Sequence, residues 1–179
     1  MIPGISARRR FSDLSEQEIL ALAIASEEDD ARIYRSYAER LREDFPDSAR
    51  MFDGMAEEED HHRHLLFELH KARFGDTIPL IRREHVAGFY ARRPVWLIEN
   101  LGLERIREEA ASMESDAHRF YLNAARRTSD ADTRKLLGDL AAAEAGHIKT
   151  ADRLEQEHLP EDVRADEDRQ AHRQFILTW

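Results

Sequence analysis

The sequence predicts an all-α fold, an antiparallel four-helix bundle with one long crossover and an extended C-terminal helix. Gly and Pro are scarce, with 7 and 5 residues among 179, whereas the helix-favouring residues Ala, Leu, Glu and Arg are abundant. Alternating runs of β-branched residues are absent, so almost no strand is expected. Breaks along the chain give the order helix, tight turn, helix, long connection, helix, tight turn, helix. Short connections make antiparallel neighbours, and the single long connection makes the crossover.

The first two predicted helices are separated by a tight turn. The first covers residues 12–44, with Ser12 or Ser15 as its N-terminal cap. Pro46 cannot continue a helix, so the turn is placed there. The second helix covers residues 49–74 and ends before a glycine, which is a common signal for a helix end.

The second half of the chain repeats this arrangement after a long connection. Proline and glycine punctuate residues 76–102, which are expected to hold one or two short helices. A third helix is predicted over residues 103–127, followed by a turn and cap at residues 128–130. The fourth helix covers residues 131–159, where Pro160 interrupts it.

Two regions are expected along the chain. Residues 1–160 form the helical bundle, and residues 161–179 form a C-terminal helical extension. The last six residues, 174–179, turn apolar after a highly charged stretch. They are expected either to pack on the bundle or to lead into a segment that is absent from this chain.

Composition excludes several classes of function. A net charge of −10 argues against a general nucleic-acid binder, which needs a basic surface, and is compatible with attracting cations. The absence of cysteine excludes disulfides, zinc–thiolate sites and iron–sulfur clusters within these residues. No signal peptide and no run of 18 apolar residues is visible, so nothing here is expected to span a membrane.

Each predicted helix carries an apolar stripe that is interrupted by polar residues at its middle. Helical spacing places these polar residues on the face that should be buried. The two halves of the chain repeat them, with 32 residues between the glutamates of the first half and 30 between those of the second. The interrupting residues are Glu27, Glu59, His62, Glu114, Glu144 and His147.

These six residues predict a site for two metal ions. A buried carboxylate costs several kcal/mol unless it is paired or binds a metal, and two divalent ions would offset four negative charges. Glu and His at positions i and i+3 point to the same side of a helix, so Glu59 and Glu144 can bridge the ions while His62 and His147 cap them. Carboxylate-rich ligation with one imidazole per ion suits iron or manganese better than zinc or copper, although zinc or manganese can substitute.

Two alternatives concern the choice of ligands. The stripe and the tyrosine spacing select Glu27, whereas matching Glu28-x-Asp30-Ala31 to Glu114-x-Asp116-Ala117 would select Glu28; we favour Glu27. The pair Glu58-x-x-His61 is a rival to Glu59-x-x-His62, but its stripe is poorly apolar.

The remaining polar and aromatic residues of these helices have two interpretations each. Tyr34 and Tyr121 lie seven residues after Glu27 and Glu114, so they are either core aromatics or hydrogen-bond donors to the ligating carboxylates. A second group is expected to form a solvated face or, as the alternative, a patch through which iron reaches the site. This group consists of Glu57, Glu58, His61, His64 and His70.

The ligand pattern resembles the rubrerythrin branch of the ferritin-like superfamily. The matching motifs are Glu27…Tyr34, Glu59-x-x-His62, Glu114…Tyr121 and Glu144-x-x-His147. A more detailed resemblance, over nearly all of residues 11–179, is to the erythrin–vacuolar-iron-transporter family, the bacterial membrane-bound ferritins. It is carried by residues 78–83 and 92–97 of the crossover and residues 134–140 of the fourth helix.

The resemblance implies a functional setting. It implies a di-iron centre in the cytoplasmic, ferritin-like domain of a bacterial inner-membrane iron exporter that confers iron and peroxide resistance, with the membrane domain following residue 179. A ferroxidase or peroxide-consuming oxidoreductase is expected, or alternatively a non-enzymatic metal-binding and dimerisation module that gates or loads the transporter. A homodimer is expected, and no nucleic-acid partner. The cysteine-ligated iron centre of typical rubrerythrins is absent, which puts a rubrerythrin-type peroxidase cycle in doubt without an outside electron donor.

Overall fold

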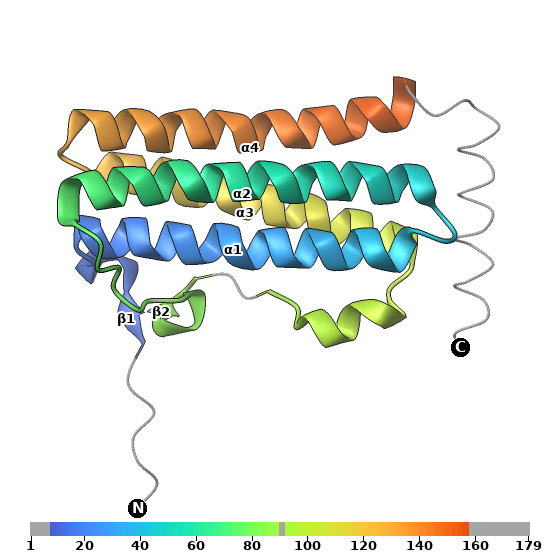
Figure 1. The fold of residues 1–179 in the computed structure, drawn as a ribbon, viewed down its shortest axis with the longest axis horizontal. Helices are drawn as coiled ribbons and strands as arrows, with labels where there is room; N and C mark the ends of the chain where they lie inside the picture. The colour runs from blue at the N-terminus through green and yellow to red at the C-terminus, as the bar shows by residue number, and fades with distance from the viewer. Residues whose placement is uncertain (1–7, 90–91, 158–179) are drawn as a thin grey trace, which may run out of the picture.

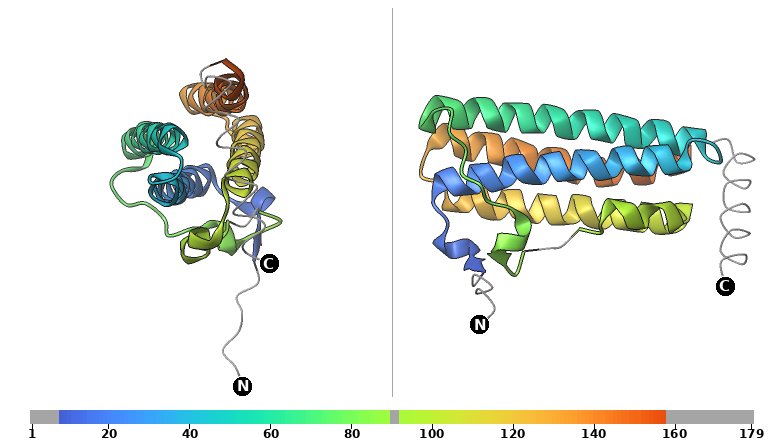
Figure 2. Two further views of the ribbon diagram at one scale, coloured as in Figure 1. Left: turned by 90° about the vertical axis from the view of Figure 1, so that its right-hand side faces the viewer. Right: turned by 60° about the horizontal axis from the view of Figure 1, so that its bottom comes forward.

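A computed structural model confirms the predicted all-α, four-helix architecture. It describes residues 8–89 and 92–157, with side chains described as far as residue 147. The four long helices, α1 (Glu16–Leu41), α2 (Pro46–Phe74), α3 (Leu103–Arg127) and α4 (Ala131–Glu157), run side by side along the bundle (Figures 1 and 2). None of the helices in this part of the chain is both long and apolar enough to cross a membrane. The expected extension at residues 161–179 lies outside the described residues.

In the first hairpin, Ser15 is confirmed as one of the two predicted caps of α1, whereas the start of α2 differs from the prediction. The side chain of Ser15 accepts a hydrogen bond from the backbone N–H of Glu18, whose own side chain accepts one from Ser15, so α1 begins at this capping box. The residues before it, Phe11–Asp13, form a separate 3₁₀ turn, η1. Helix α2 begins at Pro46, three residues earlier than predicted. Proline has no backbone N–H, and it is tolerated here because the first residue of a helix has no intrahelical acceptor for that group.

The crossover follows one side of the bundle (Figure 1), and its described residues contain two short 3₁₀ helices, in agreement with the one or two predicted. These are η2 (Arg83–His85) and η3 (Val95–Asn100). Between them lies the two-residue strand β2 (Val86–Ala87), which pairs in parallel with β1 (Arg9–Arg10). The crossover is therefore attached to the segment that precedes α1.

The hydrophobic core is divided into two clusters along the bundle. One includes Leu20 and Leu66 and the other includes Phe52 and Ile106, all completely buried. On α1, α2 and α3 the predicted polar positions fall between the apolar residues of the two clusters, and on α4 they follow Leu140 and Ala141 of the first cluster. The bundle thus encloses a polar layer in the middle of an otherwise apolar interior.

Candidate metal centre

The structure brings all six predicted residues together in this polar layer. Helix α1 supplies one glutamate, α3 supplies one, and α2 and α4 each supply a Glu-x-x-His pair. Five of the side chains are buried, whereas His147 is 18% exposed. They form two overlapping groups, each with ligand atoms within 4.8 Å of one another: Glu27, Glu59, His62 and Glu144; and Glu59, Glu114, Glu144 and His147.

Each group contains three carboxylates and one imidazole. Glu59 and Glu144 belong to both groups, so they lie where carboxylates that bridge two ions would lie. Glu27 and Glu114 each belong to one group, from opposite hairpins. The six residues can therefore bind two cations at adjacent positions, each with four potential ligand residues.

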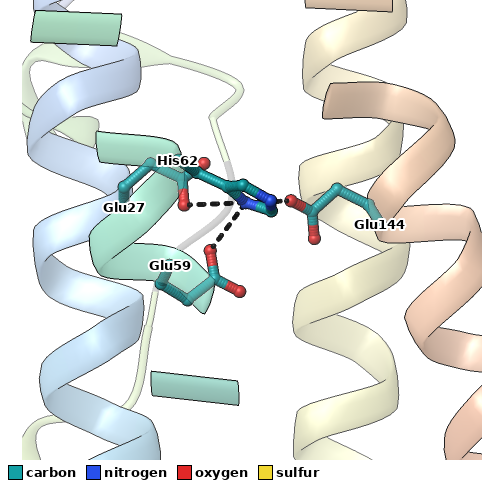
Figure 3. Close-up of side chains that lie close together, drawn as sticks. All are labelled: Glu27, Glu59, His62 and Glu144. Carbon is teal, nitrogen blue, oxygen red and sulfur yellow. Dashed lines mark ion pairs between the residues drawn. The ribbon is translucent and has the colours of Figure 1, made fainter. Parts of the chain in front are cut away.

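The first group is centred on His62 (Figure 3). Its Nδ1 atom lies 3.3 Å from Oε1 of Glu144, across the bundle, and 3.7 Å from Oε2 of both Glu27 and Glu59. The side chains approach from three helices and converge on one nitrogen. A metal ion would be coordinated by this nitrogen together with the surrounding carboxylates.

The second group is centred on His147. Its Nδ1 atom lies 3.2 Å from Oε2 of Glu114 and 3.9 Å from Oε2 of Glu144. The His147 ring is nearly parallel to that of His62, with ring centroids 6.0 Å apart. Each histidine thus directs Nδ1 toward Glu144 and toward one unshared carboxylate.

Two buried tyrosines orient the unshared carboxylates, and each does so across the bundle. The Tyr34 hydroxyl of α1 donates to Oε1 of Glu114 at 2.6 Å, and the Tyr121 hydroxyl of α3 donates to Glu27. The hydrogen-bonding interpretation of these tyrosines is therefore confirmed, with each partner on the opposite hairpin. Burial raises the pKa of both hydroxyls well above its ordinary value, so both remain donors.

Removing one of these hydroxyls should weaken metal binding. We expect Tyr34→Phe to lower metal affinity roughly tenfold, because the Glu114 carboxylate loses the donor that orients it. Tyr37→Phe is the matched control, since the equally buried Tyr37 hydroxyl reaches Glu109, outside the site, at 3.2 Å. Competition with a chromogenic chelator measures both affinities. Equal losses in the two variants would contradict the orienting role of Tyr34.

The structure separates the alternative ligands from the favoured ones. Glu28 is exposed and pairs with Arg32, so Glu27 is the α1 glutamate in the cluster. Glu58 and His61 are both exposed, and neither belongs to the two groups.

The expected solvated face on α2 is wrong at one residue. His70 is completely buried, whereas Glu57, His61 and His64 are exposed. His70 lies four residues after Leu66 and eight after His62, so it continues the buried stripe rather than the exposed one.

Comparisons with known proteins agree with this geometry. The profile of the rubrerythrin family matches residues 18–155. The chain belongs to the rubrerythrin family. A solved structure of a hypothetical protein from Pyrococcus furiosus is similar, with 26% identity and a TM-score of 0.63 over 80% of this chain and 89% of that one. A Thermotoga maritima protein described as ferritin-like and diiron-carboxylate shares the fold, with 19% identity and a TM-score of 0.63 over 82% of this chain and 97% of that one. No curated protein matches.

This rubrerythrin-family cluster has the chemistry that a cation requires. Within the described residues, four buried atoms of the cluster have no hydrogen-bond partner: Oε2 of Glu27, Nδ1 of His62 and both carboxylate oxygens of Glu144. Leaving a buried polar atom unsatisfied costs about 1–3 kcal/mol. Cations coordinated by these atoms would remove that cost, so the residues present fit a metal centre.

Without a metal, the cluster must hold protons. Burial raises the pKa of Glu144 to about 9, and burial together with the nearby Glu27 raises that of Glu59 well above normal. Burial alone would lower the pKa of His62, but the surrounding carboxylates raise it to about 12. Burial also opposes ionisation of Glu114, yet His147 and Tyr34 hold its pKa below the ordinary value. Metal binding therefore has to displace protons.

This proton uptake predicts how the stability of the metal-free protein depends on pH. The pKa of Glu144 rises from an ordinary 4.5 to about 9 in the folded chain, so between these pH values the folded state binds more protons than the unfolded state. The pKa of His62 is also raised, from an ordinary 6.5, so above pH 6.5 His62 adds to this excess of protons in the folded state. We expect the free energy of unfolding to fall as the pH rises from 7 to 9. Urea unfolding with chelator present measures it, and a flat or rising profile would contradict the proton-filled cluster.

Sequence reasoning missed two sets of interactions around the site. It placed Glu58 on a solvated face, but the Glu58 carboxylate forms an ion pair with Nε2 of His147. It also gave no structural role to the crossover arginines, of which Arg83 and Arg92 bind the buried Asp30 of α1. One sequence signal could have indicated the second interaction: Asp30 falls on the buried face of α1, where a carboxylate needs a partner, and the crossover supplies arginines.

Proposed function

We propose that this chain binds two iron ions between its helices and oxidises Fe(II) with dioxygen or hydrogen peroxide. The observation that carries the proposal is the pair of overlapping groups, each with three carboxylates and one histidine. Carboxylate oxygens with a single imidazole per ion suit iron better than zinc or copper. When bound, two iron ions supply one electron each to the oxidant.

The protein side chains have distinct tasks in this proposal. Glu59 and Glu144 hold both ions at a fixed separation, because each contributes to both groups. Glu27 and Glu114 complete the two positions and are fixed by the tyrosine hydroxyls. The buried surroundings limit access of water to the ions, since only His147 among the six ligands is appreciably exposed.

The source of electrons favours iron oxidation over a peroxidase cycle. The chain has no cysteine, so no cysteine-ligated iron centre within it can return electrons to the site. Iron is then the substrate that gives up electrons, and ferric iron is the product. A donor outside this chain would be needed for repeated reduction of peroxide.

Anaerobic loading followed by exposure to air tests the proposal. We expect two Fe(II) ions per chain after anaerobic loading and desalting, then rapid growth of near-ultraviolet ferric absorbance on adding oxygen. Two bound ions without oxidation would support the alternative, a non-enzymatic metal-binding module. One ion or none per chain would overturn the two-ion site itself.

We also propose the setting that the sequence resemblance implies. In it, the chain is the homodimeric cytoplasmic domain of a membrane-bound iron exporter, and it delivers or senses iron for that exporter. The support is the similarity of residues 78–83, 92–97 and 134–140 to the erythrin–vacuolar-iron-transporter family. Sedimentation equilibrium of the purified chain tests the dimer, and a concentration-independent monomer would contradict it.

A further inference from the structure

His147 lies between the metal centre and the surface and makes contacts on both sides of its ring. Its Nδ1 atom faces Glu114 and Glu144. Its Nε2 atom, on the far side, forms an ion pair with Oε2 of Glu58. The Glu58 side chain is 57% exposed and belongs to α2, directly before the shared ligand Glu59. A carboxylate of one hairpin thus holds the imidazole of the other.

Among the residues that the structure describes, the other histidine has no equivalent partner. By the internal repeat, the residue that corresponds to Glu58 is the one before Glu144, and this is Ala143, which carries no acceptor. Within the described part of the chain, the ion pairs of His62 all involve Nδ1, the atom that faces the centre. The His62 side chain is also half as exposed as that of His147, at 9% against 18%. The two halves of the site therefore differ outside the ligands.

This difference has a chemical consequence for metal binding. A carboxylate beside Nε2 of an imidazole favours the tautomer that carries its proton on Nε2, which leaves the Nδ1 lone pair free for a metal and increases the basicity of the ring. We propose that Glu58 is a positioning residue that makes the two metal positions unequal, so that the position containing His147 binds its ion more tightly than the position containing His62. The inference rests on the proposed two-ion centre and concerns the order in which its positions fill.

Anaerobic titration of the metal-free protein with Co(II) tests this inference. Calorimetry and the visible absorption of bound Co(II) report each step separately. We expect two unequal steps in the unmodified chain, with the tighter step lost in His147→Ala and the weaker step lost in His62→Ala. Glu58→Ala should weaken the tighter step by about 10–100-fold and leave the other unchanged. In Glu58→Gln the affinity of the tighter step should lie between those of the unmodified chain and Glu58→Ala, because the amide oxygen still places a partial negative charge beside Nε2.

Two comparisons separate positioning from a general charge effect. Glu57→Ala removes the same charge from an exposed neighbour on α2 and should leave both steps unchanged. In a His147→Ala background, Glu58→Ala should have no further effect, because the residue acts through that imidazole. Metal-free thermal unfolding should be the same for Glu58→Ala and Glu57→Ala, which shows that both variants fold.

The outcomes distinguish this inference from the proposed function. Fewer than two bound ions in the unmodified chain would overturn the two-ion centre. Two ions bound with equal affinity, or an unchanged tighter step in Glu58→Ala, would leave the centre intact and overturn the role of Glu58. An equal loss in Glu58→Ala and Glu57→Ala would assign the effect to surface charge and overturn it as well.

Discussion

A chain carrying Glu59→Ala and Glu144→Ala is expected to bind no iron and to lose all stabilisation by metal. Each of the two groups would be reduced from four ligands to two, because both residues belong to both groups. In the unmodified chain, an ion at a hundredfold excess over its Kd contributes about 2.7 kcal/mol. For a chain of 179 residues this corresponds to a rise in Tm of roughly 5–11 °C per ion. Iron content and thermal unfolding, each with and without Fe(II), measure the two effects.

A matched variant controls for the change in charge. Glu57→Ala with Glu68→Ala removes two glutamates from the exposed side of α2 and should bind iron as the unmodified chain does. Circular dichroism should show the same helix content in both double variants. If the Glu59/Glu144 variant kept its iron, the site would not be made by these carboxylates, and the bundle would have to be explained as a purely structural one.

The fold and the polar layer were predictable because both depend on local sequence patterns. Helical periodicity placed Glu27, Glu59, Glu114 and Glu144 on buried faces, and an antiparallel bundle brings the middles of its helices together. The period of the helix also favoured Glu27 over Glu28, and the structure decides between them, because Glu27 is buried and Glu28 is exposed.

Interactions between distant segments could not be derived in this way. Periodicity indicates that Tyr34 and Tyr121 are buried, but the partner of each depends on how the two hairpins are aligned, and each proves to be on the other hairpin. The same holds for Glu58, which is exposed by its position on α2 and yet contacts His147 of α4. The start of α2 at Pro46 depended on whether the proline ends one helix or begins the next, which the local sequence allows equally.

Asp30→Ala is expected to be the most destabilising single substitution outside the metal centre. Asp30 is 6% exposed, and its carboxylate lies 2.7 Å from Nη2 of Arg83 and 2.9 Å from Nε of Arg92, two residues of the crossover. Arg92 continues the network to Asp116 of α3, at 3.1 Å. Removing one partner of a buried ion pair costs about 3–5 kcal/mol, because charge is left buried without compensation. In a chain of this size that is a fall in Tm of roughly 6–20 °C.

The adjacent Asp29 provides a matched control within the same turn of α1. Its carboxylate lies 3.6 Å from Arg32 and 3.6 Å from Arg82, and these arginine side chains are 55% and 41% exposed. Ion pairs in contact with solvent contribute about 0–1 kcal/mol, so Asp29→Ala should change stability by no more than that. Urea unfolding of both variants in the metal-free state measures the difference. Similar small losses would show that solvent or relaxation compensates the buried arginines.

The Asp30 network also reaches the backbone beside the metal centre, which links stability to binding. Arg83 donates to the carbonyl oxygen of Ser26, the residue before Glu27, at 2.9 Å. Arg92 donates to the carbonyl oxygen of Met113, the residue before Glu114, at 3.3 Å. Because the crossover holds the backbone next to both unshared carboxylates, Asp30→Ala should weaken metal binding as well as lower the Tm, whereas Asp29→Ala should do neither. A destabilised Asp30→Ala chain with unchanged metal affinity would show that the helices alone fix the ligand positions.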